Sequence, residues 1–135
     1  MWLLRRQSEL DADSIRVRAT ITDFRDPATG TYLRIDWTQD PSADPVADWQ
    51  RQSQSFASRH DGYEEIRIEP VDYRDYDSAL WEYRYREDGL TFHAYNLGFD
   101  TGAYGHALNF QTPEGEWARA QDLFETFRQV FQPGI

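Results

Sequence analysis

Alternating apolar and polar side chains in the middle of the chain constrain its fold more than any other feature of the sequence. Between residues 80 and 86, the aromatic residues Trp81, Tyr83 and Tyr85 alternate with charged residues. A period of two is that of a β-strand, whose successive side chains point to opposite faces of a sheet. Similar alternation, which predicts five further strands, occurs in residues 14–24, 31–37, 63–71, 90–99 and 103–111. Short turn sequences separate the last three strands, so these strands are expected to be antiparallel neighbours.

Two other segments repeat their apolar residues every three or four positions, the period of an amphipathic helix. The first follows Asp44-Pro45, which resembles an N-cap with proline at the first helical position, and is expected to end near Gly62. The second is expected to run from Pro113 to Phe131. The predicted order is β-β-α-β-β-β-β-α. This order predicts an α+β fold, with an antiparallel sheet of about six strands and two amphipathic helices packed on it.

The length and composition of the chain exclude several classes of function. Its 135 residues suit one domain, so we expect a single domain over residues 1–135. The net charge of −10 opposes binding to nucleic acid or to an anionic membrane surface. The absence of cysteine excludes disulfides, thiolate metal sites and cysteine nucleophiles. No apolar run is long enough to span a bilayer, so the chain as given is not expected to be membrane-embedded.

Candidate functional residues gather on one predicted face of the sheet. If the turn at residues 100–102 sets a simple register, His93 and His106 share a face of adjacent strands, offset along the sheet, with Glu82 and Arg84 nearby. Together with Tyr95, these residues form the candidate binding set. One interpretation is a general base or metal site; the other is histidines that share a face by chance. Because no third ligand is visible, we predict no metal site, and no cofactor motif is present.

No catalytic motif is recognisable either, so we predict no catalytic residue. Both faces of the last three strands carry apolar or aromatic residues. One face should pack under the helices. The other must be covered, by the hairpin of residues 14–37 or by the second helix, or else it forms a binding surface.

Several segments resemble a known family. The stretches Phe24-Arg25-Asp26-Pro27 and Tyr32-Leu33-Arg34-Ile35-Asp36-Trp37 are similar to the C-terminal domain of certain actinobacterial serine/threonine protein kinases. So are residues 44–49, 73–83, 93–96 and 113–117. The resemblance implies the PsbP-like fold, which is shared with photosystem II extrinsic subunits and a Ran-binding import factor. That fold opens with a strand and a Pro-x-Gly-Trp turn; Trp2 matches the tryptophan, which implies that the preceding strand is missing and that one sheet edge is open.

The family implies a non-catalytic module that senses a ligand or holds a partner, as part of a larger actinobacterial signalling or cell-envelope protein. In the kinases the domain follows a membrane helix and faces outward, which implies an extracytoplasmic location; otherwise the location would be cytoplasmic. The expected partner is a small molecule or a protein. Two alternatives remain open: a small-molecule enzyme that uses the face bearing His93 and His106, and a domain that forms homodimers through an open strand edge.

Overall fold

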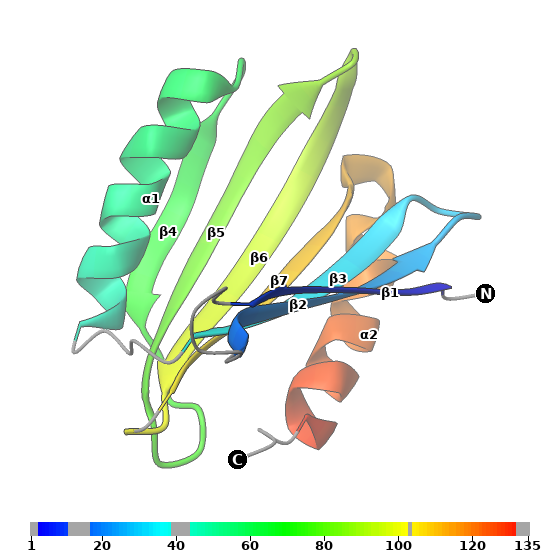
Figure 1. Cartoon of the computed structure of the whole chain (residues 1–135). Coiled ribbons are helices and arrows are strands. Elements are labelled where there is room, and N and C mark those ends of the chain that lie inside the picture. Colours follow the sequence, from blue (N-terminus) through cyan, green and yellow to red (C-terminus); the bar gives the residue numbers. More distant parts are fainter. Residues whose placement is uncertain (1–2, 11–16, 39–43, 103, 132–135) are drawn as a thin grey trace.

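The computed structural model describes residues 3–10, 17–38, 44–102 and 104–131, which form one antiparallel sheet with a helix on each face (Figure 1). The sheet has seven strands in the order β1-β2-β3-β7-β6-β5-β4. The elements are β1 (Leu3–Leu10), β2 (Val17–Asp26), β3 (Thr31–Thr38), α1 (Pro45–Arg59), β4 (Glu64–Pro70), β5 (Asp77–Glu87), β6 (Leu90–Asp100), β7 (Gly105–Pro113), the short 3₁₀ helix η1 (Glu114–Glu116) and α2 (Trp117–Val130).

The predicted α+β class, the antiparallel sheet and both helices are confirmed, but the sheet has one more strand than expected. Strand β1 pairs with β2 from Leu3↔Arg25 to Leu10↔Val17. Its sequence begins with two leucines followed by two arginines, so no alternation marks it as a strand. Strand β4, which ends in Pro70, lies at one edge of the sheet, the position at which a strand best tolerates proline. Trp2, the suggested family tryptophan, lies outside the described residues.

Local sequence signals account for the start of α1 and for the tight hairpin between β5 and β6. The Asp44 carboxylate accepts a hydrogen bond from the Ala47 N–H at 3.1 Å, as an N-cap does. Strands β5 and β6 are joined by Asp88 and Gly89, whose φ angles are +53° and +77°. Positive φ at both central residues is the conformation of a two-residue hairpin turn that follows the twist of the strands.

Helix α1 is fixed to its face of the sheet by Trp49, whose side chain is only 5% exposed. The indole Nε1 donates a hydrogen bond to the Ala79 carbonyl at 3.0 Å, and the ring lies directly against Gly98. Below the helix, Trp81 and Tyr83 stack with ring centroids 4.2 Å apart. Because Gly98 has no side chain and the stacked rings of Trp81 and Tyr83 are flat, α1 can approach the sheet closely.

Helix α2 packs on the opposite face. Its buried residues Ala120 and Phe124 meet Leu97, Leu108 and Phe110, each of which is at most 1% exposed. From the sequence, the second face could be covered by the hairpin of residues 14–37 or by the second helix, or it could be a binding surface; in the structure the second helix covers it. Among the described residues, no helix has the length and apolar character to cross a membrane.

The two helices cover different parts of the sheet. Helix α1 contacts β4, β5 and β6, whereas α2 contacts β7 (Figure 1). A helix is roughly 10 Å wide and strands are spaced by about 4.8 Å, so one helix covers two or three strands. On the α1 face, β7 and β3 therefore extend beyond the helix, and they form the floor of the cleft described below.

Replacing Gly98 by alanine should weaken the docking of α1. A Cβ at this position would lie 2.9 Å from the Trp49 ring, which is held in place by its hydrogen bond to Ala79. We expect Gly98→Ala to lower the free energy of unfolding by roughly 1–3 kcal/mol, measured by urea denaturation. Gly115→Ala is the matched control, because a Cβ there has no heavy atom within 4 Å; equal stability of the two variants would contradict the tight contact.

Candidate functional site

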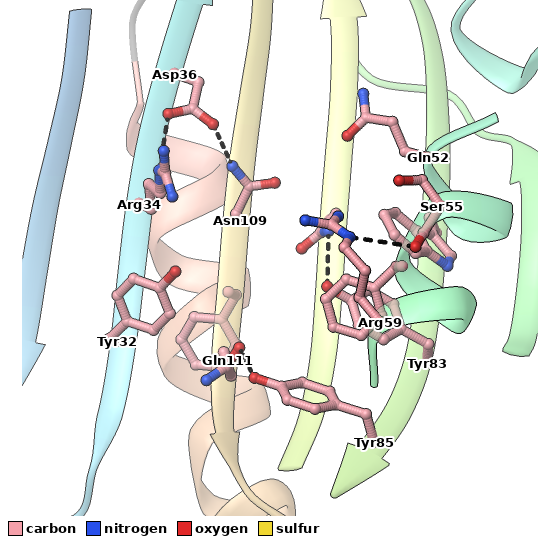
Figure 2. Close-up of a pocket in the computed structure, with 14 residues that line it drawn as sticks. Tyr32, Arg34, Asp36, Gln52, Ser55, Arg59, Tyr83, Tyr85, Asn109 and Gln111 are labelled. Carbon is pink, nitrogen blue, oxygen red and sulfur yellow. Dashed lines mark hydrogen bonds and ion pairs between the residues drawn. The ribbon is translucent and has the colours of Figure 1, made fainter. Parts of the chain in front are cut away.

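A cleft of about 410 Å³ opens on the α1 face of the sheet, between α1 and β3 (Figure 2). Its volume lies in the range of small-molecule sites, about 300–1,000 Å³. Residues from β3, β5, β6 and β7 form the floor and one side, and α1 forms the other side. The lining residues are Tyr32, Arg34, Asp36, Gln52, Ser55, Phe56, Arg59, Trp81, Tyr83, Tyr85, Asn96, Asn109, Phe110 and Gln111.

The floor of the cleft is an ordered layer of tyrosine and amide side chains. The Tyr85 hydroxyl donates to Gln111 Oε1 at 2.6 Å, and the Asn96 amide donates to the Tyr83 hydroxyl at 3.3 Å. Burial raises the pKa of Tyr83 and of Tyr85 above the usual phenol value. Both phenols therefore stay neutral across the physiological pH range, and the floor adds no negative charge to the cleft.

One side of the cleft holds its single acid, Asp36, in a fixed arrangement. Arg34 Nε donates to Asp36 Oδ1 at 3.1 Å, and Asn109 Nδ2 donates to Oδ2 at 2.8 Å (Figure 2). Burial lowers the pKa of Arg34, but the Asp36 carboxylate more than offsets this effect, so that pKa lies above its usual value. The charges of Arg34 and Asp36 thus cancel locally, and both carboxylate oxygens already accept a hydrogen bond.

The opposite side of the cleft carries a cation from the last turn of α1. Arg59 Nε donates to the Ser55 carbonyl at 3.2 Å, which directs the guanidinium across the cleft (Figure 2). Within the part of the chain that the structure describes, its terminal nitrogens have no hydrogen-bond partner. The helix C-terminus favours a positive charge at this position, which stabilises the arginine here independently of any ligand.

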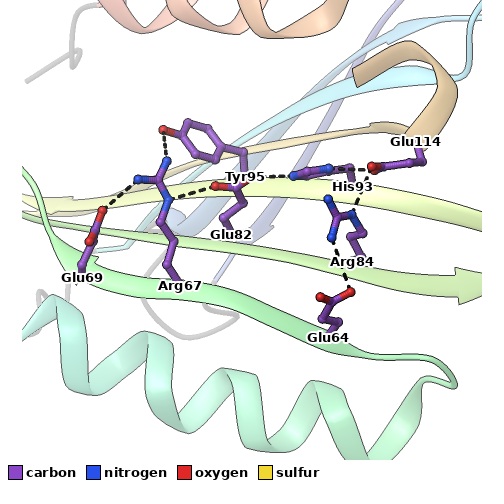
Figure 3. Close-up of polar contacts among 8 residues, drawn as sticks. All are labelled: Glu64, Arg67, Glu69, Glu82, Arg84, His93, Tyr95 and Glu114. Carbon is purple, nitrogen blue, oxygen red and sulfur yellow. Dashed lines mark hydrogen bonds and ion pairs between the residues drawn. The ribbon is translucent and has the colours of Figure 1, made fainter. Parts of the chain in front are cut away.

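On the other face of the sheet, His93 lies between two carboxylates and is only 2% exposed (Figure 3). Its Nε2 is 2.6 Å from Glu82 and its Nδ1 is 2.7 Å from Glu114. The imidazolium form, in which both nitrogens donate, satisfies both contacts. The ring also stacks on Trp117, with centroids 3.5 Å apart and planes 5° apart.

Two arginines complete this arrangement, which we call the His93 network. Arg67 donates to Glu82, Glu69 and the Tyr95 hydroxyl, and Arg84 donates to Glu114 and Glu64 (Figure 3). Its members are Glu64, Arg67, Glu69, Glu82, Arg84, His93, Tyr95 and Glu114. Each ring nitrogen of His93 faces a different carboxylate on an opposite side of the ring, so the two carboxylates do not converge on one point. Among the described residues, no group of three or more metal-binding side chains could hold an ion.

The structure brings together four of the five predicted site residues and separates the fifth. Glu82, Arg84, His93 and Tyr95 belong to the His93 network, whereas His106 pairs with Phe99 six residues further along β6. Six residues of strand span about 20 Å, so His93 and His106 cannot act on one small ligand. The predicted shared face of the two histidines is found, and a binding role for these five residues stays a prediction.

His106 stacks on Phe99, and its Nε2 is buried without a hydrogen-bond partner among the described residues. Burial lowers the pKa of His106, and the Asp100 carboxylate opposes this effect only in part. The neutral imidazole is therefore the form that the folded state prefers.

The cleft and two central members of the His93 network were not predicted from the sequence. Arg67 and Glu114 come from an edge strand and from the start of the last helical segment, where nothing in the local sequence indicates a shared partner. The signal for the cleft is present but weak: Asn96, Asn109 and Gln111 are amides placed within otherwise apolar strands.

Removing His93 should destabilise the fold more than removing an exposed member of its network. His93→Leu leaves Glu82, which is 9% exposed, without one of its hydrogen-bond partners. We expect a loss of roughly 2–4 kcal/mol in the free energy of unfolding, measured by denaturant titration. Arg84→Gln is the control, since its side chain is 35% exposed and should cost less than about 1 kcal/mol. A His93→Leu variant as stable as Arg84→Gln would show that the buried contacts contribute little.

The pKa of His106 should make stability fall at mildly acidic pH. A histidine with a lowered pKa in the folded state binds fewer protons there than in the unfolded chain. Its contribution is complete above the unfolded value, about 6.5, and is lost as pH decreases through the folded value. An NMR titration should give a midpoint for His106 below 6.5. His106→Gln should show a smaller loss of stability between pH 7.5 and 5.5 than the parent chain; an identical loss would contradict this assignment.

Comparisons with known proteins agree with this fold. The structure of PA94, a Pseudomonas aeruginosa protein of unknown function described as a candidate regulator, superposes with a TM-score of 0.72 at 13% identity, covering 96% of this chain and 98% of that one. Cyanobacterial PsbP (CyanoP) from Synechocystis sp. PCC 6803 superposes with a TM-score of 0.61 at 19% identity, covering 96% and 91%. At these identities the likeness concerns the fold, which is PsbP-like. No curated protein sequence matches the chain.

A family model gives the closer assignment. The model of the serine/threonine kinase C-terminal domain matches residues 11–133, nearly the whole chain. The matched unit is the C-terminal domain of such kinases rather than their catalytic domain. The resemblance noted in the sequence is therefore confirmed: the chain belongs to the serine/threonine kinase C-terminal domain family.

Proposed function

We propose that this domain is a non-catalytic sensor that binds a small polar molecule in the cleft between α1 and β3. The observation that carries the proposal is the ordered polar lining of that cleft. Its tyrosine, amide and arginine side chains are held by one another, from Tyr85–Gln111 to Arg34–Asp36–Asn109, yet they face open space. Side chains fixed before binding lose little freedom when a ligand arrives, which favours affinity.

The unused hydrogen-bonding capacity of the cleft supports the same proposal. Gln111 accepts from Tyr85, but its amide nitrogen has no partner among the described residues, and neither has the carbonyl oxygen of Asn109. Gln52 on α1 makes no side-chain hydrogen bond within the described ranges. These groups are open to solvent and can bind a ligand without first breaking an internal contact.

The enzyme and self-association hypotheses have less support. An enzyme that used His93 would need an accessible ring nitrogen, and both nitrogens already face carboxylates in a 2% exposed residue. Pairing through β4 is opposed by the charged residues Glu64, Glu65, Arg67 and Glu69 along this edge and by Pro70. We therefore favour a sensor of a larger signalling protein; in a receptor-type kinase it would face outward and meet an extracytoplasmic ligand.

Filling the cleft should abolish ligand binding. We expect some members of a panel of small polar metabolites to raise the melting temperature in differential scanning fluorimetry, since a ligand at 100 times its Kd stabilises by about 2.7 kcal/mol. Ser55→Trp places an indole in the cleft from α1 and should remove this shift. Gln54→Trp is the control, because Gln54 is exposed on the same helix but does not line the cleft. A shift that persists in Ser55→Trp, or no shift with any compound, would overturn the proposal.

A further inference from the structure

The charges around the cleft differ from those of the whole chain. Only three of the lining residues carry a charge: Arg34, Asp36 and Arg59. Arg34 and Asp36 neutralise each other, which leaves Arg59 as a net single positive charge at the cleft of a protein whose net charge is −10. A local field opposite in sign to that of the whole molecule favours an anionic ligand at this place.

The geometry of Arg59 suits the recognition of an anion. Its Nε is held by the Ser55 carbonyl, and no partner for the terminal nitrogens exists among the described residues. A guanidinium whose orientation is fixed while its terminal N–H groups are unoccupied can bind a carboxylate through two parallel hydrogen bonds. Figure 2 shows the side chain of Arg59 extending from α1 toward the middle of the cleft.

The other side chains that line the cleft indicate which groups the rest of the ligand would carry. The free amide nitrogen of Gln111 lies on β7, beside the Tyr85 hydroxyl that donates to Gln111 Oε1. The Asn109 side chain donates its amide N–H to the Asp36 carboxylate, which leaves its carbonyl oxygen as an acceptor beside that carboxylate. Aromatic rings from Tyr32, Phe56 and Tyr85 also line the cleft and offer flat apolar surface.

From these features we propose that the cleft binds a small monocarboxylate, with the carboxylate on Arg59 and a polar or aromatic body on the floor formed by Tyr85, Asn109 and Gln111. The inference rests on the sensor function proposed above and narrows its ligand. A single uncompensated positive charge matches a monoanion, whereas a phosphate dianion would keep one charge without a partner.

The test compares acids with their neutral counterparts. Small monocarboxylic acids of about 10–20 heavy atoms, the corresponding primary amides and inorganic phosphate are titrated into the chain, and binding is followed by ligand-observed NMR and by the melting temperature. We expect acids to bind and amides to bind at least about tenfold more weakly, since a hydrogen bond to a charged group contributes more than a neutral one.

Two variants with the same change in charge locate the site. Arg59→Gln should weaken acid binding at least about tenfold. Arg51→Gln should leave it unchanged, because Arg51 lies on the same helix, is 69% exposed and pairs with Asp48 away from the cleft.

Each outcome separates the two proposals. If amides bind as tightly as acids, or if Arg59→Gln binds acids normally while Ser55→Trp does not, the cleft is a ligand site but the carboxylate assignment is wrong. If phosphate binds as tightly as the acids, the monoanion assignment is wrong. If neither acids nor the wider panel bind at a place that Ser55→Trp blocks, both the sensor and its ligand class are overturned.

Discussion

The sheet is much wider than one helix, and this difference in width determines which strands each helix covers and which it leaves exposed. Seven strands spaced by about 4.8 Å extend over nearly 30 Å, whereas a helix is roughly 10 Å across. Since the described residues place a single helix on each face, that helix leaves several strands of its face uncovered. Helix α1 lies over β4, β5 and β6, and α2 contacts β7 from the other side. The uncovered part of the α1 face is therefore supported from behind by the core under α2, which makes a rigid floor for a binding site.

The position of α1 depends on the close approach of Trp49 to Gly98. The hydrogen bond from the indole to the Ala79 carbonyl fixes both the depth and the direction of the helix. One turn further along, Ser53 is 4% exposed and donates to Glu65, while the Tyr63 hydroxyl accepts from Trp81 Nε1. These contacts hold the helix near β4 and β5. The residues on its other side, including Ser55 and Arg59, consequently form the wall of a cleft and do not lie over β7.

The sequence was informative wherever a local pattern determines local structure. Alternation located the strands after the first helix, and Asp44-Pro45 marked the start of that helix, because strand parity and capping depend on a few neighbouring residues. Strand β1 was missed because its sequence, which has two adjacent leucines and two adjacent arginines, does not alternate. The link from Arg67 to Glu82 also depends on a register shift between Glu65 and Arg67 in β4, which alternation alone does not show. The parity of a strand tells which face a residue occupies, but not whether a helix lies above it, so the cleft could not be predicted.

The His93 network and the polar lining of the cleft differ in how many of their hydrogen-bonding groups have a partner within the protein. In the His93 network, both ring nitrogens and three nitrogens of Arg67 are engaged within the protein, so the network mainly joins β4, β5 and β6 to η1. In the cleft, Arg59 and Gln111 have N–H groups without a partner among the described residues. Strand β7 contributes side chains to both faces of the sheet. Gln111 faces the cleft, whereas its neighbour Thr112 is fully buried on the α2 side, where it hydrogen-bonds Thr31 at 2.8 Å. A ligand bound to Gln111 would thus contact the same strand that packs against α2.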